Sequence, residues 1–83
     1  MKRADLIREY VLKNYIDPSR ARGQKEITIR AGDVHRAMDL RDAMPAVASA
    51  LGANKFLEFA GIELIRREGP QNGANLFFTF RIH

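Results

Sequence analysis

The chain begins with a stretch in which apolar side chains recur at helical spacing. In residues 5–16 (DLIREYVLKNYI) the apolar positions are three or four residues apart, which is typical of an amphipathic helix. Asp5 lies in the first turn, where its negative charge suits the positive end of the helix dipole. The pair Asp17-Pro18 is expected to end the helix, because a residue before proline avoids the helical conformation. The predicted buried face comprises Leu6, Ile7, Tyr10 and Val11, followed by Asn14 or Tyr15.

A polar connection and a short alternating segment follow this helix. Residues 19–25 (SRARGQK) have no apolar side chain except Ala21, so we expect an exposed and mobile loop. Residues 26–30 (EITIR) alternate between polar and apolar side chains and include β-branched residues. This pattern predicts a short strand with Ile27 and Ile29 facing the core.

Two further helical patterns come next. The first has barely two turns and begins at Gly32-Asp33. Asp42 is expected to be the N-cap of the second, with Pro45 in the first turn, where its missing N–H costs nothing. Leu40 is expected to point from the intervening turn into the core. In the first helix one face is predicted to hold Val34, Ala37 and Met38, and His35 and Arg36 point elsewhere.

The last helical pattern begins at Met44 and is interrupted at Gly52-Ala53-Asn54, where we expect the helix to bend or restart. Its apolar positions are Met44, Val47, Ala48, Leu51, Phe56, Leu57, Phe59 and Ala60. A compact helical core is predicted from Ile27, Ile29, Val34, Met38, Leu40, Met44, Val47 and Leu51.

The C-terminal residues predict a β-hairpin with strands at 62–68 and 75–82. Its apolar residues are even-numbered in both strands, so facing partners must both be even-numbered if one face is buried. A two-residue turn at Asn72-Gly73 would break this rule. We therefore expect a loop of about three or five residues with Gly73 at positive φ. The opposite face is predicted to carry Arg67, Asn75, Thr79 and Arg81, with Ile65 and Phe77 among them.

Length and composition limit the class of protein. A chain of 83 residues and 9.4 kDa forms one small domain, residues 1–83, and the absence of cysteine excludes disulfides and thiolate metal sites. Hydrophobic residues at 46% and charged residues at 29% are ordinary for a folded globular protein. The sequence has neither an apolar run that could cross a bilayer nor a secretory signal, so we expect a cytoplasmic protein without a membrane partner.

The charge is positive and unevenly distributed. Fourteen lysines and arginines against ten acids give a net charge of +4, which favours polyanionic partners. The excess is concentrated between residues 18 and 36, where only Glu26 and Asp33 oppose the basic side chains. These basic residues are Arg20, Arg22, Lys25, Arg30 and Arg36.

The order of these elements resembles the winged helix-turn-helix family, over essentially residues 5–82. ITIRAGDVHRAMDL resembles the family's first strand and second helix, LRDAMPAVASAL its turn and recognition helix, and IELIRREGPQNGANLFFTFRI its two wing strands. The resemblance implies an α+β fold of three helices and a small antiparallel sheet, in the order α-β-α-α-β-β. It also implies binding of double-stranded DNA, with the third helix in the major groove and the wing on an adjacent groove or the backbone.

Carried onto this chain, the recognition surface would comprise Arg41, Asp42, Ala43, Pro45, Ala46, Ser49, Ala50, Asn54 and Lys55. This surface is mostly alanine, whereas base-reading helices usually display Arg, Lys, Asn or Gln. Binding is therefore expected to rely mainly on phosphates, with further donors at the wing. The candidate nucleic-acid-binding residues are Arg20, Arg22, Lys25, Arg36, Arg41, Ser49, Asn54, Lys55, Arg66, Arg67, Gln71, Asn72 and Asn75.

The residues give little support for catalysis or cofactor binding. His35 and Asp39 are four residues apart, but no third metal ligand is near them in the sequence. Acids at predicted helix ends are expected to cap helices. No glycine-rich phosphate loop or nucleophile motif is present, and the serines are limited to Ser19 and Ser49. We therefore expect a protein without enzymatic activity and without a cofactor or metal.

Two alternatives stay open. The alanine-rich third helix could be a docking face for protein assembly, either in a homodimer or with another protein, because small side chains permit close helix packing. The outward Phe77 and Ile65 could instead stack on RNA or single-stranded DNA. We expect these two side chains to be covered by the N-terminal helix or by a partner subunit, because large apolar pairs seldom stay exposed.

Overall fold

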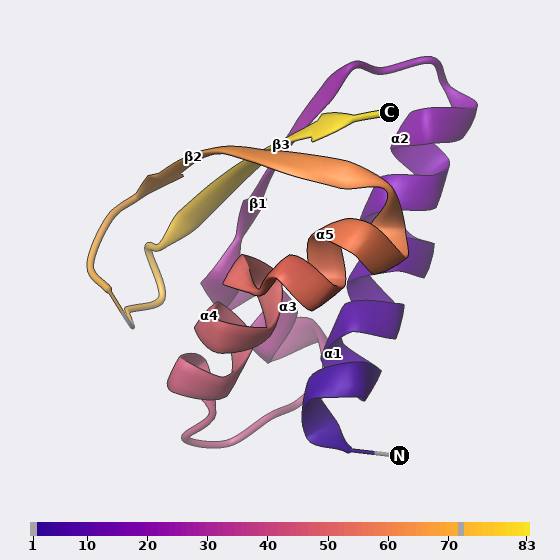
Figure 1. Cartoon of the computed structure of the whole chain (residues 1–83). Helices are drawn as coiled ribbons and strands as arrows, with labels where there is room; N and C mark the ends of the chain where they lie inside the picture. The colour runs from indigo at the N-terminus through magenta and orange to yellow at the C-terminus, as the bar shows by residue number, and fades with distance from the viewer. Residues whose placement is uncertain (1, 72) are drawn as a thin grey trace.

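The computed structural model describes residues 2–71 and 73–83, and its helices pack on one face of a three-stranded antiparallel sheet (Figure 1). The elements are α1 (Arg3–Val11), η1 (Leu12–Ile16), α2 (Asp17–Ala21), β1 (Glu26–Arg30), α3 (Ala31–Ala37), α4 (Met44–Gly52), α5 (Asn54–Ala60), β2 (Ile62–Glu68) and β3 (Phe77–Ile82). The expected α+β class is confirmed, in an order compatible with a winged-helix-like topology. The third predicted helix is divided into α4 and α5 at Ala53, where the backbone is extended, as expected for a restart.

The N-terminal helical run passes through Pro18 without ending, so the predicted stop at Asp17-Pro18 is wrong. The reason lies in η1, a π-helical turn in which the Asp17 N–H donates to the Leu12 carbonyl five residues earlier. A π turn inserts one extra residue and opens the hydrogen-bond ladder. Proline, which lacks an N–H and crowds the carbonyls of the preceding turn, is tolerated at such a point.

The π turn also changes which side chains face the core. Ile7 and Val11 are buried, and Tyr10 and Tyr15 pack against the core, as predicted; Asn14, the other position offered with Tyr15, is exposed. The extra residue of the π turn shifts the buried face by one position, so that Ile16 is the next fully buried residue. The prediction is wrong for Leu6, which is exposed.

The expected mobile loop at 19–25 is partly an ordered helix end. Ser19 is buried inside α2, and the helix closes with the Gln24 N–H on the Ser19 carbonyl and the Gly23 N–H on the Arg20 carbonyl, both at 3.0 Å. This is the Schellman pattern, in which a residue with positive φ ends the helix. Gly23 supplies that conformation, with φ at 75°.

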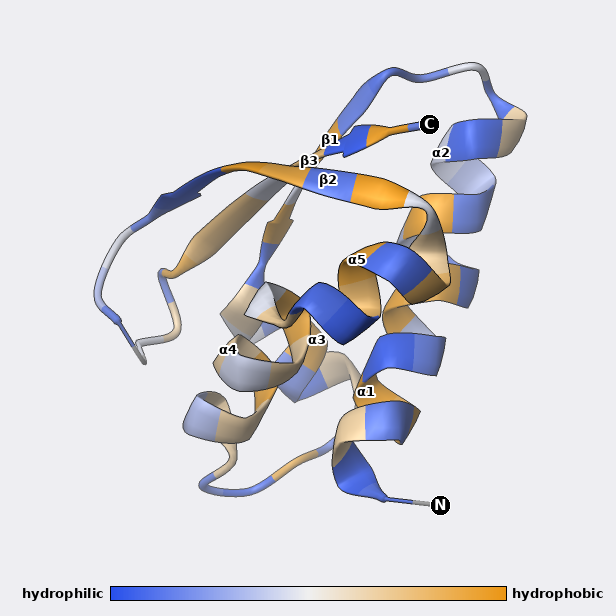
Figure 2. Ribbon diagram, in the orientation of Figure 1, coloured by the Kyte–Doolittle hydropathy of each residue, from blue (hydrophilic) through white to orange (hydrophobic). Residues whose placement is uncertain are grey.

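The sheet has the strand order β1-β3-β2, and its inner face forms the core against the helices. Ile27 faces Phe80 and Ile29 faces Phe78 across β1 and β3, so both isoleucines point inward as predicted. The Phe80 ring is stacked against Phe78 at 6.0 Å and meets the edge of Phe56 at 5.7 Å. Figure 2 shows apolar residues in the strands and on the helices beneath them. The other predicted core residues are buried or packed against this cluster.

The hairpin register follows the even-numbered rule only in its first half. Ile62 faces Ile82 and Leu64 faces Phe80, but the pairing shifts between Leu64 and Arg66. The register change leaves Ile65 out of the pairing, so Arg67 rather than Arg66 comes to lie opposite Phe78. The prediction that Arg67 shares a face with Thr79 is therefore wrong.

The turn of the hairpin is longer than the predicted three or five residues and spans residues 69–76. Its returning arm is held on α3, because the Ala31 N–H donates to the Leu76 carbonyl at 2.8 Å and the Gly32 N–H to the Ala74 carbonyl at 3.1 Å. Among the described residues, the positive φ of this turn is found at Gly69 (108°) instead of Gly73. Anchoring on α3 explains the length of the turn, since the chain must reach that helix before it enters β3.

The connection between α3 and α4 differs from its prediction at two points. Asp42 is not the N-cap of α4, because it has a left-handed φ of 49° and Ala43 takes the cap position. The Ala43 N–H donates to Nε2 of His35 at 3.2 Å, so a histidine of α3 holds the start of α4, which has no side-chain cap of its own. Ala37 is exposed because α3 ends at that residue. Leu40 packs against the core as predicted.

Candidate nucleic-acid interface

The wing turn, residues 69–76, lies on the same side of the molecule as α4 (Figure 1). Arg67 joins the two: its guanidinium carbon lies 5.1 Å from the centroid of the Phe78 ring, and its Nη2 donates to the Gln71 carbonyl at 3.1 Å. A Cβ on Gly52 of α4 would lie 3.3 Å from Nη1 of Arg67. The absence of a side chain at Gly52 thus leaves room for the guanidinium between helix and wing. No carboxylate pairs with Arg67 among the described residues.

We call this region the α4–wing surface. It consists of the side chains Arg41, Pro45, Ser49, Arg67 and Gln71, all exposed. Ala43 and Ala50, which were expected here, are buried; Ala50 is only 1% exposed. Both alanines are buried because α4 and its N-terminal end pack against α1 and α3. Alanines at those positions allow the helix backbones to approach, and Nε of Arg8 donates to the Ala50 carbonyl at 3.4 Å.

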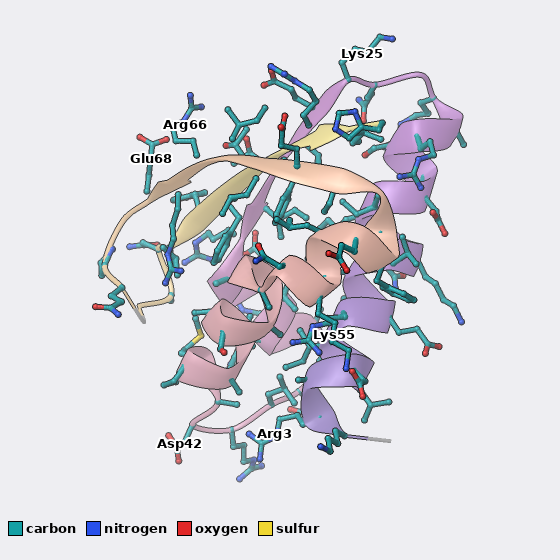
Figure 3. All side chains as sticks on the ribbon, in the orientation of Figure 1. Arg3, Lys25, Asp42, Lys55, Arg66 and Glu68 are labelled. Carbon is teal, nitrogen blue, oxygen red and sulfur yellow. The ribbon has the colours of Figure 1, made fainter. Side chains whose placement is uncertain are left out.

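Arg66 and Arg67 do not act as a pair. The register shift places them on opposite faces of the hairpin, and Arg66 forms a 2.7 Å ion pair with Glu68 on the outer face. Figure 3 shows both of these side chains above the β2 ribbon, away from the helices. Of the two arginines, only Arg67 belongs to the α4–wing surface.

Arg20 uses its donors inside the protein. Its Nη2 donates to the carbonyls of Ala60 (2.5 Å) and Gly61 (3.3 Å), and its Nε donates to the carbonyl of His83 (3.2 Å). Its Nη1 also forms an ion pair with Asp17 at 3.2 Å. The bonds to Ala60 and Gly61 satisfy carbonyls at the end of α5, which a helix leaves without partners. Arg20 therefore joins the N-terminal helical run to the last helix and strand.

Replacing Arg20 by alanine is expected to lower the free energy of unfolding by about 2 kcal/mol, because charge-assisted hydrogen bonds to three carbonyls are lost. Urea denaturation followed by circular dichroism measures this change. Arg22→Ala is the matched control, since Arg22 is exposed and should change stability by less than about 0.5 kcal/mol. Equal stabilities of the two variants would exclude the structural role of Arg20.

The remaining candidate residues are scattered. Lys25 lies at the end of the molecule opposite Arg3 and the α3–α4 turn, as Figure 3 shows. Lys55 lies near α1, where its Nζ is 3.6 Å from Asp5. Oδ1 of Asn75 accepts two bonds from the Arg30 guanidinium, at 2.9 and 3.1 Å, and is thus part of the wing's own support. Arg22, Arg36 and Asn54 are exposed on other elements, and Asn72 lies outside the described residues.

The sequence pattern did not predict that Arg67 would face the helices. A weak signal was available, because the alternation of β2 breaks after Leu64, where Ile65 is followed by three charged residues. Such a break is typical of a β-bulge, which redirects the side chains beyond it.

The outer face of the sheet is open. Ile65 and Phe77 are exposed, so of the two predicted covers the N-terminal helix is wrong, because the helices all pack on the other face (Figure 1); cover by a partner subunit stays a prediction. The hydroxyls of Thr28 and Thr79 share a 3.0 Å hydrogen bond at its centre. Arg66 and Arg81 form ion pairs with Glu68 and Glu63 on this face. The carboxylates of Glu63 and Glu68 therefore offset the positive charge that a nucleic-acid-binding face requires.

The two side chains with shifted pKa values lie outside the α4–wing surface. Burial raises the pKa of the Tyr15 hydroxyl, and a hydrogen bond to Glu9 raises the pKa of Lys13; both groups lie on η1. Within residues 2–71 and 73–83 there is no cluster of three potential metal ligands, and no helix is long and apolar enough to cross a membrane. The chain matches no family model, no curated protein and no solved structure.

Proposed function

We propose that this protein is a non-enzymatic module of the winged helix-turn-helix type that binds double-stranded DNA through its α4–wing surface. The observation that carries the proposal is the position of Arg67. An arginine that rests on an aromatic ring and is anchored by one hydrogen bond has lost part of its freedom before binding, so less entropy is lost when it contacts a phosphate.

The contacts are expected to be mainly with phosphates. The exposed side of α4 presents Pro45 and Ser49, which lack the paired donors and acceptors that distinguish guanine from adenine. Arg41, in the turn before α4, and Arg67 at the wing supply the positive charge of this small-residue surface. A helix with short side chains can approach a groove closely while the two arginines neutralise the flanking backbone.

The test is a titration of a random-sequence duplex with the full chain, followed by fluorescence anisotropy at several salt concentrations. If Arg41 and Arg67 each neutralise one phosphate, the slope of log K against log salt is expected to be about −2. Arg67→Ala should weaken binding about tenfold and reduce the slope by about 1, whatever the sequence. Arg22→Ala, the matched control on the far end of the molecule, should leave both unchanged.

Several results would contradict this function. They are salt-independent affinity, equal losses in the Arg67 and Arg22 variants, or stronger binding of RNA or single-stranded DNA than of duplex in competition. The last result would favour the outer sheet face with Ile65 and Phe77. The alternative of assembly through the alanine-rich helix loses its main support, because Ala48 and Ala50 are part of the chain's own core.

A further inference from the structure

A groove of about 200 Å³ lies between α1 and α5, on elements that the proposed function does not use. It is lined by Asp5, Arg8, Glu9, Lys55 and Phe59. Phe59 is 55% exposed, more than any other large apolar side chain among the described residues. The core does not need it, because Phe56 fills the buried side of α5.

The charges around Phe59 distinguish this groove from the rest of the surface. Two acids and two bases line it, so it is neutral in a chain whose net charge is +4. Lys55 is 72% exposed and lies only loosely against Asp5, at 3.6 Å. Its ammonium is therefore free to reach a carboxylate on another molecule. Asp5 is also paired with Arg8 at 3.1 Å and Glu9 with Lys13 at 2.9 Å, so the groove offers no excess positive charge to a polyanion, whereas two copies of this chain can meet there without charge repulsion.

We propose that the α1–α5 groove is a homodimer interface in which Phe59 of each copy packs into the groove of the other. In a twofold dimer the same patch is used on both sides, so each Lys55 can face the acids of the partner's α1. Opposite charges then surround a central pair of aromatic rings, which is the arrangement expected of an interface core with a polar rim.

The position of the groove is compatible with a free α4–wing surface. Figure 3 shows Lys55 over α5 toward α1, on the side of the molecule away from the wing turn. A standard interface buries about 800 Å² per partner, roughly one sixth of the 5011 Å² surface of this chain. With one aromatic anchor per copy, we expect a dissociation constant in the micromolar range.

Sedimentation equilibrium of the full chain, from about 10 μM to about 1 mM, tests the proposal. The wild-type chain should change from monomer to dimer over this range. Phe59→Ser should remain monomeric, while Phe77→Ser, which removes an exposed phenylalanine from the outer sheet face, should dimerise like the wild type. Circular dichroism of each variant confirms that the fold is kept.

A charge-reversal cycle adds a readout that loss of folding cannot imitate. Lys55→Glu and Glu9→Lys should each weaken dimerisation at least tenfold, because each brings like charges together across the interface. The double variant restores opposite signs and should recover most of the affinity. A wild-type chain that stays monomeric at 1 mM, a dimer that Phe77→Ser but not Phe59→Ser dissociates, or a double variant no better than the singles would overturn the proposal.

Discussion

Replacing Phe80 by alanine is expected to remove most of the stability of the fold. Phe80 is fully buried between Phe56 and Phe78, at the point where the sheet meets α5. Truncation of a buried phenylalanine costs about 3 to 5 kcal/mol, and a chain of this length has a total stability of about 4 to 12 kcal/mol. At the lower end of that range the variant is largely unfolded at room temperature.

Urea denaturation monitored by circular dichroism measures this loss. Phe77→Ala is the matched control, because Phe77 lies on the same strand but is 37% exposed on the open face of the sheet. Its loss should cost less than about 1 kcal/mol. Similar denaturation midpoints for the two variants would mean that the aromatic cluster is not the centre of the core.

Gly69→Ala is expected to have the second largest effect, a loss of about 2 to 4 kcal/mol. Gly69 has a φ of 108°, a conformation that residues with a side chain rarely adopt, and a Cβ there would overlap the Asn75 carbonyl oxygen. Movement of a neighbouring side chain cannot relieve the strain or the overlap, because the atoms that a Cβ would meet belong to the backbone of Asn75 and Leu76. The wing turn must therefore open, which would release the Ala31 N–H from the Leu76 carbonyl.

A control variant at Gly23 separates the strain of a positive φ from the overlap with Asn75. Gly23 also has a positive φ, at 75°, but a Cβ there would meet nothing within 4 Å. Gly23→Ala should therefore cost only the conformational strain, about 1 kcal/mol. Thermal unfolding compares the stabilities, and hydrogen exchange at the amide of Ala31 reports the opening of the turn. If the two alanine variants were equally stable, overlap with Asn75 would not be the cause of the loss.

Much of the fold could be predicted because it follows from local patterns. The alternation of EITIR, the even-numbered apolar residues of the hairpin and the interruption at Gly52-Ala53-Asn54 all correspond to elements of the structure. Each of these signals depends on neighbouring residues alone. The α+β class could be obtained from them without knowledge of long-range contacts.

The predictions that failed depend on contacts between distant residues. The start of α4 is held by His35 of another helix, a contact that a capping rule based only on adjacent residues such as Asp42 cannot predict. The length of the wing turn is determined by its attachment to Gly32, where a Cβ would lie 2.7 Å from the Ala74 carbonyl oxygen. Neither contact produces a periodic pattern in the sequence from which it could be predicted.

The candidate site was predicted less well than the fold, for a related reason. Charge composition identifies basic residues but does not show whether their donors are already used. Arg20 is bonded to three carbonyls of the C-terminal half, and Arg30 is bonded to Asp33 and Asn75. The bulge in β2 then decides which of two adjacent arginines faces the helices.

The π turn in η1 determines how the two ends of the N-terminal helical run are rotated relative to each other. Each residue of an α-helix turns the chain by about 100°. If residues 12–16 formed a regular α-helix instead, the extra residue would rotate everything beyond it by that angle relative to Ile7 and Val11. Arg20 would then move away from the Ala60 carbonyl, and Ser19 would leave the interior. The wider π turn takes up the extra residue and so keeps both halves of the run aligned with the core that they pack against.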